Sequence, residues 1–290
     1  MDNPITILPP HVLHPRTLHE NQYVYAVLSR RSKGISIGVN LNPDKICNFD
    51  CIYCQVDRTT PPLLRDVDED ALLRELSQTL AEWKDGSLFQ GENLRKVPEH
   101  LRRLNDIAFS GDGEPSTYPR FKEIVEKVAK LKSDLGFKDV KIVLITNATM
   151  FHRPNVAAAI DIMMANNGEV WAKLEAGTQE YYQFVERTSV PLSKVLDNIR
   201  ELAKRHPVVI QSLFMKVNGA APPDSEIAAY IERLKEILAA GGKLDRIQIY
   251  TVARQPAESY VAALEPAFVD EITAKVKSAT GLPVESFYGS

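Results

Sequence analysis

The stretch Cys47-Asn48-Phe49-Asp50-Cys51-Ile52-Tyr53-Cys54 contains every cysteine of the 290-residue chain. Soft thiolates select zinc, copper(I) or iron–sulfur clusters. A structural zinc site takes four protein ligands, usually Cys or His, but the chain has no fourth cysteine and no histidine between Asn21 and Glu99. A cubane cluster normally takes four cysteines, so three thiolates leave one iron open to a substrate or cofactor. We expect Cys47, Cys51 and Cys54 to hold one [4Fe–4S] cluster; the alternative is three unrelated buried thiols.

The length and composition are those of a single large α/β domain. Apolar residues make up 44% of the chain, and the net charge is −3 with a pI near 6.1. That balance gives no overall basic field of the kind that many nucleic-acid-binding proteins have. Met1 to Pro10 has no cationic region followed by an apolar run, and no apolar run reaches the roughly 18 residues of a membrane span. We therefore expect a cytoplasmic protein with no signal peptide and no membrane partner.

Strands and helices are predicted to alternate along the chain. Strands are expected at 33–40, 106–110, 140–146, 169–175, 208–216 and 246–252, with amphipathic helices between and after them, one of which is capped by Asp224. Consecutive strand–helix units give parallel strands joined by right-handed crossovers. Six units are too few to close an eight-stranded barrel, so we predict an α/β fold, a partial (β/α)6 barrel open on one side. Residues 1–290 would form one domain, with 1–32 as an N-terminal extension packing on the barrel and a core of about 33–282.

Polar residues gather where the predicted strands end, which is where an α/β barrel carries its chemistry. The first strand leads straight to the cysteine loop, and the second ends in Ser110-Gly111-Asp112-Gly113-Glu114-Pro115. Glycines let the backbone approach a ligand closely, and Glu114 can accept a hydrogen bond from an ammonium group. By itself a glycine-rich turn is a weak signal.

Other strand ends carry residues with two interpretations each. Trp171, Lys173 and Glu175 share one face of the fourth strand, and burying Lys173 beside Glu175 is costly unless the two pair or bind something. They form either a structural ion pair or a cofactor contact, with Lys173 near a carboxylate and Glu175 near a ribose. Asn147 is either a turn cap or a ribose contact. The basic run 29–34 is either a solvated turn or an anion contact beside the cysteine loop.

Together these motifs resemble the radical S-adenosylmethionine (SAM) superfamily over nearly the whole chain. The C-x3-C-x2-C spacing matches its cluster motif, and the turn at 110–115 resembles its G-G-E-P motif, with Asp112 where the commonest version has glycine. In that superfamily SAM chelates the open iron, and electron transfer from the cluster cleaves SAM to a 5′-deoxyadenosyl radical. A looser resemblance to the wyosine-synthase-related branch is carried by Ser29-Arg30-Arg31, Asn42-Pro43-Asp44-Lys45-Ile46, Tyr53-Cys54-Gln55, Phe109-Ser110-Gly111, Thr146-Asn147 and Thr251-Val252-Ala253-Arg254.

The resemblance implies a set of SAM contacts. The glycine-rich turn would hold the methionine amino group on Glu114, and Tyr53 would either contact the adenine or shield the cluster. No catalytic residue is assigned beyond the cluster ligands. The residues expected around SAM are Tyr53, Gly111, Asp112, Gly113, Glu114, Asn147, Lys173, Glu175, Gln211, Thr251 and Val252.

The predicted function is that of a radical SAM enzyme that abstracts hydrogen from an unidentified small molecule or nucleoside, with a reductant such as flavodoxin or ferredoxin. Cations near strand ends favour an anionic substrate unless protein carboxylates neutralise them: Lys45, Arg58, Lys216 and Arg254. The wyosine-forming enzyme holds a second cluster with further cysteines and acts on tRNA, whereas this chain has no further cysteine and no basic excess. The alternatives are a tRNA-base-modifying enzyme or a glycyl-radical activase with a protein partner, and a non-catalytic iron–sulfur or SAM-binding protein.

Overall fold

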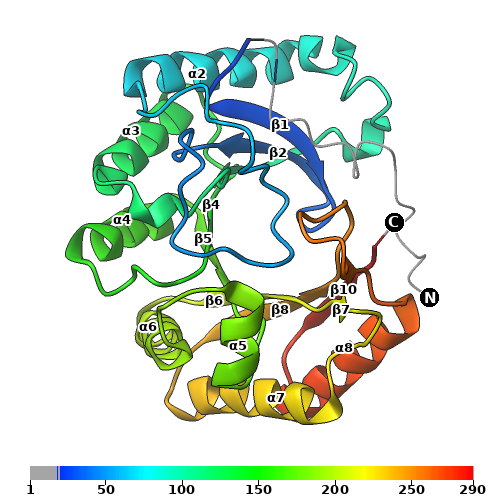
Figure 1. Cartoon of the computed structure of the whole chain (residues 1–290). Coiled ribbons are helices and arrows are strands. Elements are labelled where there is room, and N and C mark those ends of the chain that lie inside the picture. Colours follow the sequence, from blue (N-terminus) through cyan, green and yellow to red (C-terminus); the bar gives the residue numbers. More distant parts are fainter. Residues whose placement is uncertain (1–17, 19, 290) are drawn as a thin grey trace.

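The computed structural model describes residues 18 and 20–289, and its centre is an eight-stranded sheet with the order β1-β2-β3-β4-β5-β6-β8-β10. All neighbouring pairs are parallel except β1 and β2, which are antiparallel. The sheet curls into a half-barrel, and Figure 1 looks along it with the helices on the outside. The strands are β1 (Val24–Ser29), β2 (Gly34–Val39), β3 (Leu104–Phe109), β4 (Lys141–Thr146), β5 (Gly168–Lys173), β6 (Val208–Leu213), β8 (Leu244–Tyr250) and β10 (Val284–Phe287).

Helices cover the outer face of the sheet, and the main hydrophobic core lies between the two layers. The outward side chains of successive strands, such as Ile37, Ile107 and Leu144, are fully buried against the helices. Burial of each such side chain contributes roughly 1.5–3 kcal/mol relative to exposure. The helices are α2 (Glu69–Asp85), α3 (Phe121–Asp134), α4 (Pro154–Ala165), α5 (Gln179–Glu186), α6 (Leu192–Arg205), α7 (Asp224–Ala239) and α8 (Pro266–Thr280).

Local sequence signals account for most helix ends. Asp68 caps α2 by accepting a hydrogen bond from the Ala71 amide, and the helix ends at Gly86 with a φ of 84°. Thr178 caps α5 in the same way. The prediction that Asp224 caps a helix is wrong, because Pro223 is the N-cap residue and Asp224 begins α7. Its carboxylate still lies in the first turn, where the helix dipole favours negative charge.

The predicted partial barrel is confirmed. All six expected strands are present as β2, β3, β4, β5, β6 and β8, joined in the predicted order. The fifth ends at Leu213 rather than 216, because the chain leaves the sheet there and Lys216–Val217 forms β7, which pairs with β9 (Val261–Ala262). The sixth spans Leu244–Tyr250 rather than 246–252.

Two edge strands were not predicted. β1 lies in the stretch expected to be an extension, and it enters the sheet through a tight hairpin to β2 rather than through a crossover helix. β10 lies beyond the expected core end at 282 and pairs with β8. The two edges are not hydrogen-bonded to each other, so the sheet stays open.

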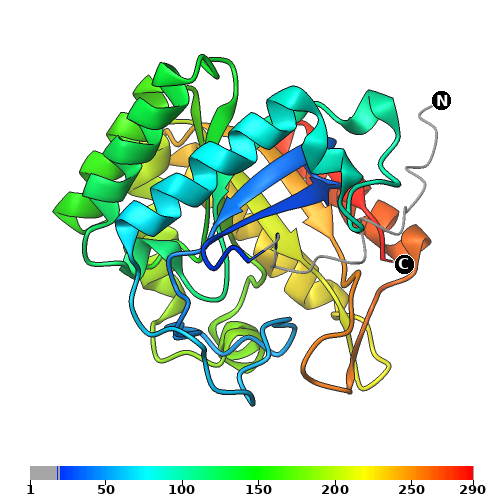
Figure 2. The ribbon, with the colours of Figure 1, turned by 90° about the horizontal axis from the view of Figure 1, so that it is seen from above.

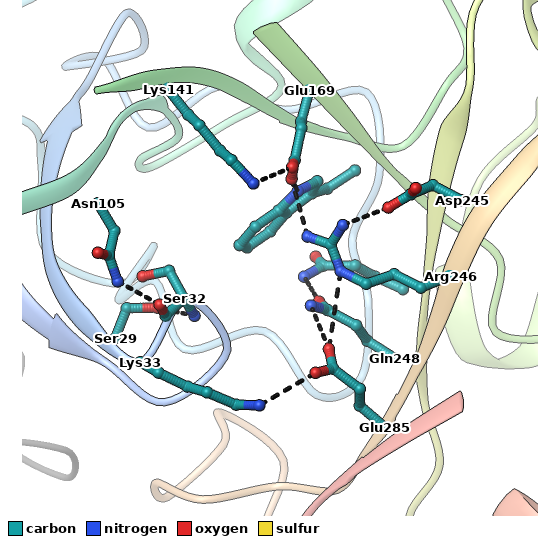
Figure 3. Close-up of polar contacts among 12 residues, drawn as sticks. Ser29, Ser32, Lys33, Asn105, Lys141, Glu169, Asp245, Arg246, Gln248 and Glu285 are labelled. Atoms are coloured by element: carbon teal, nitrogen blue, oxygen red, sulfur yellow. Dashed lines mark hydrogen bonds and ion pairs between the residues drawn. The ribbon is translucent and has the colours of Figure 1, made fainter. Parts of the chain in front are cut away.

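The inner face of the half-barrel carries polar and charged side chains around a small apolar cluster of Ala108, Val143, Trp171 and Val209, in contrast to the apolar outer face. At the end where the parallel strands begin, Lys141, Glu169, Arg246, Glu285 and Lys33 form a chain of ion pairs (Figure 3). Above it the lumen holds Trp171, whose indole nitrogen donates to Glu169 at 2.8 Å. We call the chain of ion pairs from Lys141 to Lys33 the basal network. At the opposite end the loops after β2 (blue) and after β8 (orange) gather at one edge, as Figure 2 shows.

No helix in the described part of the chain is both long and apolar enough to cross a bilayer.

Asp106 is a buried carboxyl of the lumen whose ionisation should oppose folding. It is 2% exposed and accepts a hydrogen bond from the Ser36 hydroxyl, and burial raises its pKa from 3.8 to about 6. Because the folded state binds this proton more tightly than the unfolded state, the contribution of Asp106 to stability falls as the pH rises from about 4 to about 6.

We therefore expect Asp106→Asn to gain stability relative to the wild type between pH 4 and pH 7, by on the order of 2–3 kcal/mol for a shift of this size. Urea denaturation of both proteins at the two pH values measures the difference. Asp134→Asn, on an exposed site, is the control. Equal changes with pH in D106N and the wild type would contradict the raised pKa.

Candidate functional site

A cavity of about 270 Å³ opens at the carboxyl ends of the strands and extends into the lumen. The loops after β2, β3, β4 and β8 each contribute to its wall. Chain segments more than 200 residues apart in sequence therefore share one site. Of the residues predicted to hold the cluster or SAM, those that line it are Cys47, Cys51, Tyr53, Cys54, Gly111, Asp112, Gly113, Glu114, Asn147, Lys173, Thr251 and Val252.

The cysteine loop is held in place by backbone contacts with the end of α5. The amide of Asp50 donates to the Glu186 carbonyl at 3.1 Å, and the amide of Ile52 donates to the Val185 carbonyl at 2.9 Å. The Ile52 side chain is fully buried. This anchoring fixes the backbone between Cys47 and Cys54 while leaving all three thiols at the cavity wall.

The three thiols are unoxidised and partly buried. Within the described residues, no three His, Cys, Asp or Glu side chains converge as they would around one metal ion. A cubane cluster does not require such convergence, because each thiolate binds a different iron. Burial raises the pKa of Cys47 and Cys51. A bound cluster supplies the positive charge that stabilises thiolates, so this set of soft ligands fits an iron–sulfur cluster better than a single ion.

Glu186 is a site residue that the sequence analysis missed. The Cys51 thiol donates to its Oε2 atom at 2.8 Å, across 135 residues of sequence. Glu186 is 2% exposed, and burial together with the nearby Glu175 carboxylate raises its pKa well above the usual value. The available signal was an acidic residue on the buried face of α5, four positions after Tyr182.

Both glycines of the turn after β3 are required by close packing. A Cβ atom on Gly111 would lie 2.3 Å from the Asn40 side-chain oxygen, and one on Gly113 would lie 2.2 Å from the Ile46 carbonyl oxygen. Asp112 has no positive φ angle, so this position does not need the glycine of the commonest motif. Instead its carboxylate accepts from the side-chain nitrogen of Asn40 at 2.7 Å, which ties the turn to the end of β2.

Glu114 joins the glycine-rich turn to the end of β4. Its Oε1 atom accepts from the Ser116 amide and hydroxyl and from the Thr146 hydroxyl, and its Oε2 atom accepts from the Asn147 amide at 2.7 Å. A carboxylate oxygen has two acceptor sites. Oε2 therefore keeps one acceptor for a ligand, while Oε1 is fully occupied.

Asn147 connects β4 to the cysteine loop rather than standing free at the strand end. Its side-chain nitrogen donates to the Asn48 oxygen at 2.8 Å, and its side-chain oxygen accepts from the Thr149 amide and hydroxyl. The contacts of its side-chain oxygen with Thr149 are those of a turn cap, which was one of the two interpretations of Asn147. One amide hydrogen is left for a ligand.

Lys173 and Glu175 lie close to Tyr53, and the structural ion pair, one of their two interpretations, is not formed between them among the described residues. The Tyr53 hydroxyl donates to Glu175, and the Lys173 ammonium lies 5.3 Å from the centre of the Tyr53 ring. Burial opposes the charge on Lys173, but the surrounding acidic groups, Glu175 first among them, together raise the Lys173 pKa. Glu175 is 2% exposed and does not line the cavity.

Gln211 is also absent from the cavity wall. It is fully buried in the lumen, where its oxygen accepts from Arg31 and its nitrogen donates to Gln248 at 2.8 Å. Arg31 itself does line the cavity, as do Arg30 and Ser29. The run 29–34 therefore meets the cavity from the lumen side rather than beside the cysteine loop.

The four cations used to predict an anionic substrate have different environments. Lys216 pairs with Glu265 and does not line the cavity, so it does not support that prediction. Arg58 lines the cavity but pairs with Asp50 at 3.4 Å. Lys45 donates to the Thr60 carbonyl at an exposed position. Arg254 lines the cavity, and its interactions there are with the protein.

The family model of the Radical SAM superfamily matches residues 41–221, which include the cysteine loop and the glycine-rich turn. The chain belongs to the radical SAM superfamily. The resemblance drawn from the motifs is thereby confirmed. The match begins just after β2 and runs past β7, so it covers β3 to β7 but not β2 or β8.

Curated relatives of this radical SAM chain are distant. It is 24% identical to a UPF0026 protein of Helicobacter pylori over 79% of this chain and 65% of that protein, and 24% identical to a UPF0026 protein of Methanocaldococcus jannaschii over 84% and 66%. It is 22% identical to a protein named GTPase Obg of Brachyspira hyodysenteriae over 82% of this chain. The chain spans only 31% of that protein and about two thirds of the UPF0026 proteins.

Solved structures share the radical SAM fold. SuiB of Streptococcus suis, bound to S-adenosylmethionine, matches 86% of this chain and 50% of its own, with a TM-score of 0.57 and 13% identity. TYW1 with a lysine–pyruvate adduct matches 88% of this chain and 84% of its own, with a TM-score of 0.55 and 13% identity. At 13% identity the likeness concerns the fold alone. TYW1 is therefore a structure of the same architecture.

The packing of Gly113 against Ile46, the residue before Cys47, predicts that Gly113→Ala will be destabilised by about 1–3 kcal/mol, the usual cost of overpacking. Because the displaced carbonyl belongs to the cysteine loop, G113A should also retain less iron after reconstitution. Urea denaturation and iron analysis measure the two effects.

Gly91→Ala is the matched control, since its Cβ would meet nothing closer than 3.7 Å and its φ is −64°. We expect G91A to stay close to the wild type in both measurements. Equal behaviour of G113A and G91A would show that the turn does not depend on the close approach.

Proposed function

We propose that this protein is a radical SAM enzyme that holds one [4Fe–4S] cluster on Cys47, Cys51 and Cys54 and binds SAM in the cavity beside it. The observation that carries the proposal is the gathering of all three cysteines of the chain and the Gly111–Pro115 turn at one cavity of a radical SAM fold. When bound, the cluster supplies the electron that cleaves SAM to methionine and a 5′-deoxyadenosyl radical, which abstracts hydrogen from the substrate.

The residues of the chain have distinct parts in this proposal. The open acceptor site on the Glu114 Oε2 atom receives the SAM ammonium group, while the absence of side chains at Gly111 and Gly113 keeps the turn close to the cysteine loop. Lys173 supplies a buried positive charge for the SAM carboxylate. Tyr53, held by Glu175, presents its ring to the cavity as an adenine contact or as a shield for the cluster.

Thr251 and Val252 line the same cavity after β8, where they would complete the SAM contacts. Glu175 and Gln211 lie behind the wall, so in this proposal they act by orienting Tyr53 and Arg31 rather than by touching SAM. We also propose a cytoplasmic protein reduced by a flavodoxin or ferredoxin, because a cluster held on all three cysteines of the chain suits a reducing compartment.

The cysteine set predicts the metal content. Anaerobic reconstitution should give about four irons and four sulfides per chain, as one cubane requires. Cys51→Ser should lose most of this iron, because the chain has no spare cysteine to replace the ligand. A value near eight irons, or stoichiometric zinc without iron, would exclude a single cubane.

The same preparation should cleave SAM. With dithionite as reductant, the reconstituted wild type should form 5′-deoxyadenosine and methionine, and Cys51→Ser should form neither.

Glu114→Gln should bind SAM more weakly than the wild type by roughly 1–3 kcal/mol, the scale for a hydrogen bond with a charged partner. Glu126→Gln, on the exposed side of α3, is the matched control and should bind SAM as the wild type does.

The alternatives differ from this proposal in partner or in chemistry. A wild type that binds SAM and cluster but never forms 5′-deoxyadenosine would favour the non-catalytic protein. A salt-sensitive gel shift with tRNA would favour the tRNA-modifying enzyme, and radical formation on an added protein would favour the activase. Product analysis with small molecules and nucleosides distinguishes these outcomes from the proposed one.

A further inference from the structure

The hairpin between β1 and β2 brings two consecutive arginines to the lumen end of the cavity. Arg30 and Arg31 follow β1 directly, and both line the cavity together with Ser29. The Arg31 guanidinium carbon lies 5.0 Å from the centre of the Tyr250 ring and 5.9 Å from that of Trp171. These rings belong to β8 and β5, so the guanidinium reaches across the lumen.

Neither guanidinium has a carboxylate partner within ion-pair distance among residues 18 and 20–289. Arg30 donates to the Tyr288 carbonyl, and Arg31 donates to the Gln211 oxygen at 3.4 Å. Both acceptors are neutral. Burial and the adjacent charge of Arg31 lower the Arg30 pKa to about 10. The two positive charges therefore share a confined space in which no described residue supplies a counter-charge.

The nearby carboxylates are already occupied. In the basal network Glu169 binds Lys141 and Arg246, and Glu285 binds Lys33 and Arg246 (Figure 3). Asp245 also pairs with Arg246. Three cations and three carboxylates thus balance one another below the cavity. Asp106 accepts from Ser36, and its raised pKa disfavours its charge. Glu175 accepts from the hydroxyls of Tyr53 and, at 3.5 Å, Tyr250.

A relay of amides orients Arg31 without neutralising it. The oxygen of Gln211 accepts from Arg31, the nitrogen of Gln211 donates to the Gln248 oxygen at 2.8 Å, and the nitrogen of Gln248 donates to Glu285 at 3.5 Å. Gln211 and Gln248 are neighbours in register and are both fully buried. With its faces near the aromatic rings and one nitrogen on Gln211, the guanidinium keeps further in-plane N–H donors for a ligand.

We propose that Arg31, assisted by Arg30, binds an oxyanion of the substrate, a carboxylate or a phosphate, at the floor of the lumen. This assignment rests on the proposed function, because it places the anionic end of the substrate opposite the cysteine loop in the same cavity. A planar guanidinium grips either group through two parallel hydrogen bonds. The anion also supplies a counter-charge that no described residue gives the two arginines, so its binding offsets the repulsion between them.

Isothermal titration calorimetry of the reconstituted protein with SAM and no reductant tests the assignment. The probes are inorganic phosphate and methyl phosphate in one arm, acetate and propionate in the other, and neutral propionamide as the uncharged comparison. The variants are Arg31→Gln, which removes the charge, and Arg31→Lys, which keeps the charge without the fork. Arg102→Gln is the matched control, because Arg102 also stacks on a ring, Phe89 at 4.6 Å, but lies away from the cavity.

The wild type and R102Q should bind the anions of at least one arm and ignore propionamide, with R31Q at least about tenfold weaker, as expected for a charge-assisted hydrogen bond. The arm that binds assigns phosphate or carboxylate. If R31Q fails to reconstitute, R31K decides: a threefold or greater loss of affinity supports the assignment. Wild-type affinity in R31Q overturns the assignment. If only R31K folds, wild-type affinity in R31K overturns it. A wild type that binds none of the anions also overturns it.

This measurement is separate from the test of the proposed function, because it needs no turnover. A protein that cleaves SAM but binds anions independently of Arg31 would leave the proposed function standing and remove the anion site. A protein that binds anions through Arg31 but never cleaves SAM would leave the anion site standing and remove the proposed function.

Discussion

The buried carboxylate of Glu114 joins two of the loops that form the cavity, and the geometry of the site depends on it. Glu114 accepts hydrogen bonds from its own turn and from Thr146 and Asn147 at the end of β4. Asn147 in turn donates to Asn48 inside the cysteine loop. A buried charge is stable only when such donors surround it, so the requirement to satisfy Glu114 also fixes the cysteines relative to the glycine-rich turn.

The contrast between the two faces of the sheet explains where chemistry can occur. The outer face buries apolar side chains under helices and holds the fold together. The inner face carries polar and charged groups, which an open barrel of few strands leaves room for. Below the cavity these groups neutralise one another through the basal network, whereas Arg30 and Arg31 remain without a carboxylate among the described residues. The lower end of the lumen is therefore closed by satisfied charge, and Arg30 and Arg31 lie next to that end, opposite the cysteine loop.

Periodicity was sufficient to predict the six central parallel strands, because each is long, apolar on its outer face and followed by an amphipathic helix. β10 has only four residues, of which only Phe287 is buried, so it lacks the pattern of a core strand. β1 carries a clear apolar run, but it belongs to a hairpin and so lacks the strand–helix alternation that marks the others. Both edges were missed because pairing, rather than local pattern, makes them strands.

The sequence by itself determined the cysteine set, the glycine-rich turn and the superfamily, because these depend on residue types at short, fixed spacings. Only the tertiary structure decided which distant side chains meet. Glu186 reaches Cys51 across 135 residues, and Arg31 reaches Gln211 across 180. Such contacts depend on strand register and on which face each side chain takes, and a shift of one residue reverses the face. Lys216, expected at a strand end beside the substrate, lies outside the cavity on Glu265 because the chain leaves the sheet after Leu213, while Arg31 lies inside the cavity.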